Sequence, residues 1–313
     1  MAGTLSLCMI VRDEAADLEA CISSMSGLAD EVVVLDTGST DGTRAIARRL
    51  ADTVGDYSWE DHFGAARNAA LSLCTGDFVL TLDADERFKT GGAAVRAAML
   101  DPKLIAAEIE IQNQLDDGKV ASFWATRLFR RIPGVEWTGR IHEQVEPSIG
   151  RLMRRDPSWR GARIDAVIEH HGYTAAATKE KGKGERNRRL LSMALEELKE
   201  DAPLPLRVYT TYKYGCELGG LGGGSAYLIE AGLLLLHASD VERVEVAIAG
   251  EVLVVAAKEL LDEGRLSEAA DAIALARTIS AGHPMVLLRS AEVALARGLP
   301  EEAHSFLGLS ETE

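Results

Sequence analysis

One short segment, Gly76 to Phe88, concentrates residue types that bind metal ions; it reads GDFVLTLDADERF. Its first half is apolar, as in a parallel strand that is buried on both faces. Asp83, Asp85 and Glu86 follow directly, and their like charges repel one another unless a cation or solvent offsets the repulsion. The spacing Asp-x-Asp therefore predicts a divalent-metal site at the end of this strand. A solvated acidic turn is the alternative interpretation.

Two earlier strands are expected to end beside this segment. Leu5–Val11 and Glu31–Asp36 are short apolar runs typical of buried parallel strands; Glu14 follows the first, and Asp36 ends the second. Strands that alternate with helices form a mainly parallel sheet, which binds ligands beyond the carboxyl ends of its strands. All these carboxylates should therefore line one edge, where a nucleoside diphosphate needs a metal ion to bridge it to them.

The turn after Asp36 argues against a phosphate cradle. Residues 37–42 are acidic and lack the G-x-G-x-x-G pattern, so Asp36 is better suited to accept hydrogen bonds from a base N–H or a ribose hydroxyl. A helix is predicted over Phe63–Leu71, with Arg67 and Asn68 as its only strongly polar residues. These two residues either form an exposed face of the helix, or bind the ligand, or brace the acidic strand ends.

Histidines and a glutamate follow in the next part of the chain. Alternating apolar residues predict a hairpin over residues 105–130. His142 and Glu143 come after it and are adjacent, so on a strand they would face opposite sides and one of them could point into a catalytic site. His170 and His171 are interpreted either as packed or solvated residues or as metal or phosphate contacts.

The second half of the chain is predicted to be helical. Apolar residues recur at helical spacing from Leu190 onward, and similar segments that begin at Gly264 and Gly298 are 34 residues apart. That period suggests tetratricopeptide-like repeats. We therefore expect an α/β domain over residues 1–178 and a helical domain over 179–313. The basic segment Lys179–Arg189, at the start of the second domain, is either a solvated linker or a lid whose cations meet a departing diphosphate.

Composition limits the class of protein. A net charge of −15 argues against general nucleic-acid binding, and 47% hydrophobic with 27% charged residues is ordinary for a soluble globular protein. The four cysteines show no C-x-x-C spacing, which fits a reducing cytoplasm. No secretory leader is recognised, and the longest later apolar block, Leu233–Leu236, is far shorter than the roughly 20 residues of a membrane span.

The ordered motifs of the first half make the chain resemble family 2 glycosyltransferases of the GT-A fold, in the subgroup that carries a C-terminal tetratricopeptide-like helical region. The matching segments, in chain order, are CMIVRDE at Cys8–Glu14, DEVVVLDTGSTDGT at Asp30–Thr43, FGAARNAAL at Phe63–Leu71, GDFVLTLDADE at Gly76–Glu86, RLFRR at Arg127–Arg131, GRIHEQV at Gly139–Val145 and HHGY at His170–Tyr173.

This resemblance implies a mainly parallel, Rossmann-like sheet with helices on both faces, followed by an all-α domain. It implies a nucleotide-sugar donor, with base and ribose near Glu14 and Asp36 and a Mn²⁺ or Mg²⁺ ion on Asp85 and Asp83. It makes Glu143 a candidate base, with His142 and His171 as candidate metal contacts. The implied donor-binding residues are Val11, Arg12, Glu14, Asp36, Ser39, Asp41, Arg67, Asn68, Asp83, Ala84 and Asp85.

The activity expected from these residues is metal-dependent transfer of one sugar, from a UDP-sugar by preference, to an acceptor hydroxyl or thiol. The Q-x-x-R-W signature of processive members is missing, so the expected transferase is non-processive, and attack assisted by Glu143 implies inversion. The acceptor could be a protein, a glycan or a small molecule. A nucleotidyltransferase is an alternative, although the acidic Arg12-Asp-Glu14 replaces the basic phosphate loop it needs. A non-catalytic adaptor that uses its helical repeats is a second alternative. The repeats could contact another protein or a second copy of this chain.

Overall fold

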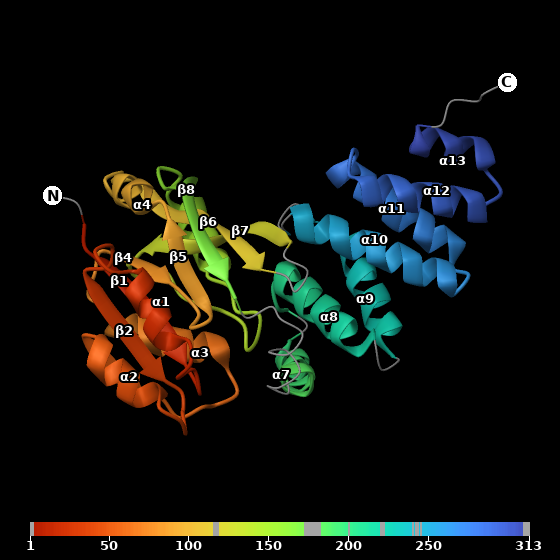
Figure 1. Ribbon diagram of the computed structural model, residues 1–313. Helices are drawn as coiled ribbons and strands as arrows, with labels where there is room; N and C mark the ends of the chain where they lie inside the picture. The colour runs from red at the N-terminus through yellow and green to blue at the C-terminus, as the bar shows by residue number, and fades with distance from the viewer. Residues whose placement is uncertain are drawn as a thin grey trace. The chain divides into compact units, whose positions relative to one another are not determined.

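The structure is a computed structural model, which describes residues 3–114, 119–171, 183–199, 201–219, 223–239, 241, 244 and 246–308. The chain divides into two compact units, Met1–Lys183 and Gly184–Glu313 (Figure 1). The sequence places the change of domain between residues 178 and 179. That position, and the first four residues of the basic segment Lys179–Arg189, lie outside the described residues, so the lid interpretation concerns a segment that is only partly described.

The first unit is built on one eight-stranded sheet with the order β3-β2-β1-β4-β7-β6-β8-β5. The strands β1 to β4 are parallel to one another, as expected from their apolar runs. Strand β7 is antiparallel to both neighbours, β5 is antiparallel to β8, and β6 is parallel to β8. The sheet is therefore mixed, and β6 with β7 forms the expected hairpin. The strands are β1 (Leu5–Val11), β2 (Glu31–Asp36), β3 (Thr53–Asp56), β4 (Phe78–Thr81), β5 (Glu86–Thr90), β6 (Leu104–Gln114), β7 (Val120–Arg130) and β8 (Arg160–His170).

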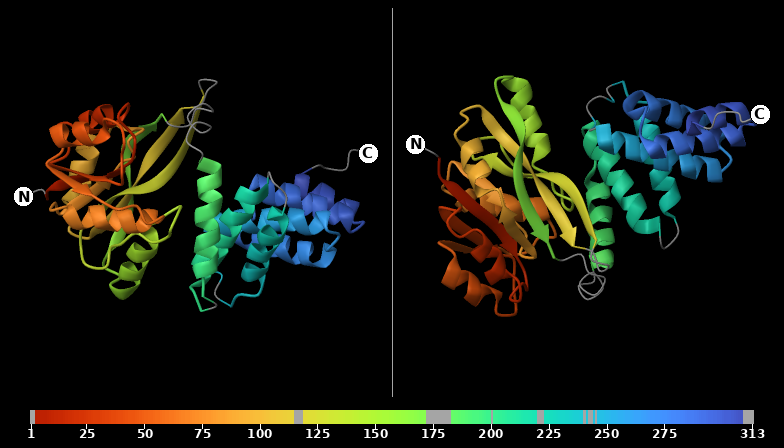
Figure 2. Two further views of the ribbon diagram at one scale, coloured as in Figure 1. Left: turned by 90° about the horizontal axis from the view of Figure 1, so that it is seen from below. Right: turned by 45° about the horizontal axis from the view of Figure 1, so that its top comes forward.

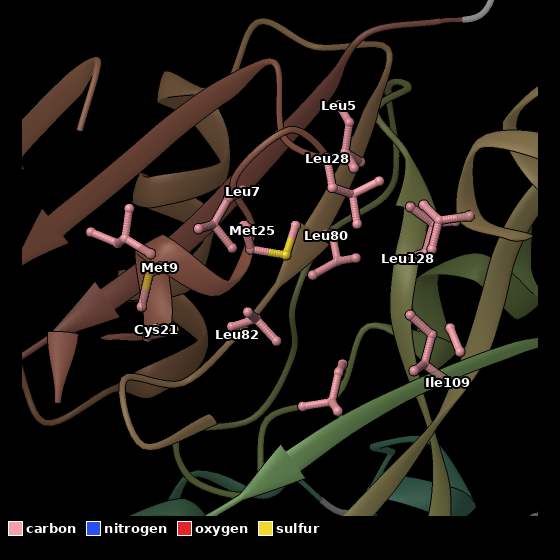
Figure 3. Close-up of a cluster of buried hydrophobic side chains, with 14 of the residues drawn as sticks. Leu5, Leu7, Met9, Cys21, Met25, Leu28, Leu80, Leu82, Ile109 and Leu128 are labelled. Carbon is pink, nitrogen blue, oxygen red and sulfur yellow. The ribbon is translucent and has the colours of Figure 1, made fainter. Parts of the chain in front are cut away.

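Helices cover both faces of this sheet because successive residues of a buried strand point to opposite sides. Leu5, Leu7 and Met9 of β1 pack with Met25 and Leu80 in one buried cluster (Figure 3). Neighbouring positions of the same strands pack in a second cluster on the other face, together with residues of α3 and α5. The helices are α1 (Leu18–Ser24), α2 (Thr43–Leu50), α3 (Phe63–Leu73), α4 (Gly92–Met99) and α5 (Glu146–Arg155).

Two local features shape the segments that precede α1 and β8. Asp13 follows β1 with φ 55°, and its carboxylate accepts hydrogen bonds from Thr40, whereas α1 begins only at Leu18. The Pro- and Arg-rich stretch before β8 contains α5. Pro147 is tolerated there because the first turn of a helix does not need its N–H, while Ile149 provides a buried contact.

The second unit is helical throughout its described residues. Consecutive helices from α8 to α13 pack against one another in chain order (Figure 2). Gly264 and Gly298, which are 34 residues apart, both have φ near 75° and end α10 and α12 in the same way, as expected of a repeat. Part of the glycine run 219–224 lies between α8 and α9, and residues 220–222 are outside the described ranges. The helices are α7 (Lys183–Glu197), α8 (Leu204–Leu218), α9 (Gly224–Leu236), α10 (Val246–Asp262), α11 (Leu266–Ser280), α12 (Pro284–Ala296) and α13 (Pro300–Leu307). In the described ranges, we find no helix with the length and apolar character needed to cross a membrane.

Candidate active site

The acidic segment forms β4 and the tight turn after it. Ala84 is buried, whereas the side chains of Asp83 and Asp85 remain partly exposed at the edge of the sheet. Glu86 is buried: its Oε2 accepts the N–H of Asp83 at 2.8 Å, and its Oε1 accepts from Arg127 Nη2 at 2.5 Å. Burial raises the pKa of Glu86 to about 7. Only two of the three carboxylates are therefore presented at the edge, and Glu86 shapes the turn.

Arg67 on α3 connects two of the predicted site carboxylates. Its Nη2 donates to Asp83 Oδ1 at 2.8 Å, and its Nε donates to Glu143 Oε1 at 2.5 Å. The side chain is only 10% exposed, and its guanidinium lies 5.0 Å from the centre of the Trp137 ring. Burial opposes the charge of Arg67, but the two carboxylates outweigh burial and raise its pKa. Partial desolvation raises the pKa of Asp83, but the positive charges of Arg67 and Arg127 outweigh this effect and lower the pKa.

Glu143 belongs to a tight loop, residues 138–144. Thr138 and Gln144 exchange two backbone hydrogen bonds of 2.9 Å that close it. The first two N–H groups of α3 donate to the carbonyl groups of residues 140 and 139, at 2.8 and 3.1 Å. A Cβ atom on Gly64 would lie 2.6 Å from the carbonyl oxygen of residue 139, so only glycine permits this approach. Helix α3 therefore positions the loop through its backbone as well as through Arg67.

Asn68 holds the start of the same loop. Its side-chain Nδ2 donates to the carbonyl of Trp137 at 2.9 Å, and its Oδ1 accepts the N–H of Trp137 at 2.8 Å. His142 has φ 51°, and the other non-glycine residues with positive φ in the described chain are Asp13 and Asp61, which also lie in loops. Such backbone conformations are costly and are typical of functional sites.

Strand β8 brings His170 to the acidic turn. Its Nε2 lies 3.4 Å from Asp85 Oδ2, and its Nδ1 lies 2.8 Å from Asn113 Oδ1. The hydrogen bond and charge of Asp85 raise the pKa of His170. His171 donates its backbone N–H to the carbonyl of Asp85 at 2.9 Å, but its exposed ring lies nearer Glu169, at 3.9 Å. The sequence analysis proposed His171 as a metal contact and did not identify Asn113. The alternating apolar pattern of β6 could have indicated that Asn113 lies on the buried face near the end of that strand.

A cleft of about 420 Å³ lies beside the carboxyl ends of β2 and β3. It is lined by Arg12, Thr37, Gly38, Arg44, Asp56, Tyr57, Ser58 and Trp59. Asp36 borders this lining and is fully buried. Its Oδ1 accepts from the N–H groups of Gly38 and Ser39 and from Arg44, at 2.9–3.0 Å. Its Oδ2 is buried without a hydrogen-bond partner. An unsatisfied buried acceptor is costly, so a donor group of a ligand would complete this site.

Several predicted donor-binding residues connect the loops that follow β1 and β2. Ser39 Oγ accepts the N–H of Asp13 at 2.9 Å, and Asp41 Oδ2 accepts the N–H of Ala15 at 3.1 Å. The N–H of Glu14 donates to Thr43 Oγ1 at 2.7 Å. These groups hold the rim of the cleft in place.

The remaining two predicted residues come from the end of β1. Val11 is buried, and its carbonyl oxygen accepts from the N–H and the hydroxyl of Thr37 at 2.9 and 3.1 Å. Arg12 is exposed and lines the cleft. The side chain of Arg12 is therefore available to a ligand, whereas Val11 shapes the end of the strand.

The acidic turn fits a divalent cation that a diphosphate helps to bind. Within the described ranges, no three His, Cys, Asp or Glu side chains are grouped so that they could hold a metal ion by themselves. Asp83, Asp85, His142 and His171 thus form no closed protein cage. Asp83 and Asp85 do offer hard oxygen atoms at an open edge, and Mg²⁺ commonly takes one or two carboxylates together with phosphate oxygens. This donor set suits Mg²⁺ or Mn²⁺.

The parallel half-sheet, the acidic turn after β4 and the cleft beside Asp36 define a GT-A-type α/β domain. Residues 6–101 match the family model described as glycosyl transferase family 2. Over these residues the amino-terminal part of the chain is similar to that family, and a helical, tetratricopeptide-like region follows it. Both the family resemblance and the fold class expected from the sequence are confirmed.

Individual relatives cover different parts of the chain. It is 38% identical over 201 residues to a TPR repeat-containing protein of Synechococcus elongatus, spanning 64% of this chain and 50% of that protein. It is 40% identical over 82 residues to an uncharacterized glycosyltransferase of Rickettsia felis, spanning 26% of this chain and 29% of that protein. The chain thus spans half or less of the length of these curated relatives. A solved mannosyltransferase of Pyrobaculum calidifontis in complex with GDP-Man and Mn²⁺ aligns with a TM-score of 0.44 at 16% identity, over 99% of this chain and 86% of that chain.

Proposed function

We propose that this chain transfers a single sugar from a nucleoside-diphosphate sugar, with uridine as the base, to a hydroxyl or thiol of an acceptor. The observation that carries the proposal is the contact of Arg67 with both Asp83 and Glu143. Arg67 thus holds Asp83, a carboxylate suited to the donor's metal ion, close to Glu143, a carboxylate suited to proton abstraction. The family 2 domain provides the context for this chemistry.

The donor nucleotide is assigned to the cleft beside Asp36. A uracil N–H or a ribose hydroxyl would supply the hydrogen bond that Asp36 Oδ2 lacks, once the bound nucleotide displaces the groups that cover this oxygen. Arg12 and Trp59 line the same cleft and offer a cation and an aromatic surface to the nucleotide. The bonds from Gly38, Ser39 and Arg44 keep Asp36 ionised, because they lower its pKa against the effect of burial.

The diphosphate is assigned to the acidic turn, with Asp83 and Asp85 holding Mg²⁺ or Mn²⁺. That ion would stabilise the negative charge that develops on the departing diphosphate. The protein orients the two carboxylates before the donor arrives. Arg67 fixes Asp83, while His170, itself hydrogen-bonded to Asn113, lies against Asp85.

Glu143 is proposed to accept the proton of the acceptor group. Arg67 occupies Oε1 of Glu143, whereas Oε2 makes no hydrogen bond among the described residues, and its lone pairs can receive that proton. Attack by the acceptor on C1 of the sugar, from the side opposite the leaving diphosphate, then inverts the configuration at C1. Without a signature for repeated addition, one sugar is transferred per acceptor site.

The four cysteines are unpaired, which supports action in a reducing compartment such as the cytoplasm. The helical unit is proposed to recruit the acceptor or another protein, since stacked helix pairs present extended binding surfaces. These two assignments are separate from the chemistry of the first unit.

A thermal-shift panel of nucleotide sugars, each with and without Mn²⁺, tests the donor assignment. We expect one nucleotide sugar to raise the melting temperature in a Mn²⁺-dependent way, followed by slow release of nucleoside diphosphate in the absence of acceptor. Asp85→Asn should lose the Mn²⁺-dependent part of the shift and keep the melting temperature of the free protein. Binding without any dependence on a divalent ion would remove Asp83 and Asp85 from the donor site.

A further inference from the structure

Residues 57–62, which connect β3 to α3, hold one wall of the cleft beside Asp36. Trp59 lines that cleft. Its indole Nε1 donates to Asp61 Oδ1 at 2.8 Å, and its ring packs against Phe63 in a T-shaped arrangement with the ring centres 4.7 Å apart. The aromatic wall of the cleft is therefore attached to the residues at which α3 begins, and its position follows theirs.

Arg140 binds the same turn from the loop that carries Glu143. Its Nη1 donates to the carbonyl oxygen of Asp61 at 2.8 Å and to that of Glu60 at 3.3 Å. Its own carbonyl oxygen accepts the N–H of Phe63 at 2.8 Å. The side chain and the backbone of Arg140 together form a clamp on residues 60–63, and Glu143 follows this clamp by three residues in the chain.

Both of the segments that the clamp joins contain strained backbone. Asp61 has φ 56° and His142 has φ 51°, and such conformations are costly for residues other than glycine. They persist only where the surrounding contacts determine them. The clamp supplies such contacts, because Arg140 donates to Asp61 itself and His142 follows Arg140 by two residues. The clamp therefore favours one arrangement of the two segments.

We propose that Arg140 is a positioning residue, which couples occupation of the cleft by the nucleotide to the placement of Glu143. A nucleotide that packs against Trp59 restrains residues 59–63, and the clamp transmits this restraint to the loop of residues 138–144. The residues that line the cleft do not include Arg140, so it acts through the turn and not by contact with the nucleotide. This inference rests on the proposed function, since it needs the nucleotide beside Trp59 and Glu143 as the base.

Hydrogen exchange followed by mass spectrometry tests this coupling without any need for turnover. We expect UDP with Mn²⁺ to slow amide exchange in residues 57–62 and also in residues 138–144 of the wild type. In Arg140→Met, UDP should still slow exchange in residues 57–62, but residues 138–144 should lose most of that protection. Protection of 138–144 that is equal in both proteins, or absent from the wild type while 57–62 is protected, overturns the inference alone. A wild type with neither segment protected contradicts the nucleotide assignment, and the inference with it.

A double-mutant cycle with Glu143 separates positioning from a general loss of stability. Arg140→Met should lower kcat about 10-fold, because misplacing a reacting group by about 1 Å can cost ~10²-fold, and should leave the donor KM near its wild-type value. In the Glu143→Gln background the same substitution should lower kcat far less, since the base that Arg140 positions is gone. Arg140→Lys should restore part of the rate, because its ammonium group can still donate to a carbonyl oxygen of the turn. Losses that simply multiply in the double variant contradict the positioning role.

Arg131 provides the matched control, because it also donates to two consecutive backbone carbonyl groups. Its Nε and Nη2 bind the carbonyl oxygens of Gly76 and Thr75 at 2.7 and 3.0 Å, just before the amino end of β4. Arg131→Met should lower the melting temperature much as Arg140→Met does, but leave kcat and the response of residues 138–144 to UDP unchanged. Equal losses of kcat in the two variants would show a structural effect alone and would overturn the positioning role of Arg140.

Discussion

The α/β unit and the helical unit are each stabilised internally by a different kind of contact. In the α/β unit, polar side chains connect positions that are far apart in sequence: Arg67 reaches Glu143, 76 residues away, and Arg87 reaches Asp17, 70 residues away. In the helical unit, ion pairs such as that between Arg265 and Glu268 lie within one helix or its cap. Its buried contacts join each helix to its neighbours in the stack.

This difference indicates where substitutions should have wide effects. A long-range polar network fixes several elements at once, so losing one member should affect both stability and activity. A stack of helix pairs distributes its stability over similar local interfaces, so a change there should remain local. The following substitutions test that contrast, beginning with the largest expected effect.

Glu143→Gln should reduce donor turnover about 10³-fold, because loss of a general base commonly costs 10²–10⁴ in rate. The amide keeps an oxygen that can accept from Arg67 but removes one of the two charges that offset the buried guanidinium, so the melting temperature should fall as well. The measurement is release of nucleoside diphosphate in the presence of Mn²⁺. Glu136→Gln, an exposed carboxylate paired with Arg151, is the matched control. Normal turnover by Glu143→Gln would exclude Glu143 as the base.

Arg67→Met should lower the free energy of unfolding by about 3 kcal/mol, since it leaves Asp83 and the largely buried Glu143 without their shared cation. Arg67→Lys should recover only part of the lost free energy of unfolding, because a single ammonium group cannot donate to both carboxylates as the planar guanidinium does. Urea denaturation measures both variants.

The helical unit provides the comparison for Arg67→Met. Arg265→Met removes a partly exposed ion pair within one helix start and should cost only about 0.5 kcal/mol. Equal losses for Arg67→Met and Arg265→Met would contradict the contrast between the two units.

Gly64→Ala should lower the free energy of unfolding by about 2 kcal/mol, because the new methyl group would lie 2.6 Å from a backbone oxygen and force the 138–144 loop away from α3. Donor turnover should fall as well, since Glu143 moves with that loop. Gly92→Ala, whose Cβ would meet Leu28 at an ordinary 3.7 Å, is the control. A Gly64→Ala enzyme with full turnover would show that the loop tolerates displacement.

Gly298→Ala should cost about 1 kcal/mol, because alanine at φ 76° is strained while no neighbouring atom lies within 4 Å of its Cβ. Gly264→Ala, one repeat earlier, should cost a similar amount. Neither should alter donor turnover, which is measured beside thermal unfolding. A turnover defect in either variant would show that the helical unit affects the catalytic site.

Local sequence patterns were sufficient to predict the parallel half-sheet, the strand ends that carry its carboxylates and the repeated helix pairs. Apolar runs of strand length require burial on both faces, and parallel strands must end at one edge, so Asp36, Asp83 and Asp85 could be placed without any long-range information. The glycine period of 34 residues likewise reflects a local requirement for positive φ at each turn.

The pairing of the polar groups, in contrast, follows from the three-dimensional packing of the chain. Glu86 looks like Asp83 and Asp85 in sequence, yet it is buried against Arg127; and His170, rather than its neighbour His171, contacts the carboxylate of Asp85. The contact of Arg67 with Glu143 joins residues from a helix and a distant loop. Such pairings depend on strand register, on loop closure and on the direction of individual side chains. Local propensity and periodicity carry no information about these, because the partners are separated by dozens of residues and are selected by the packing of the whole sheet.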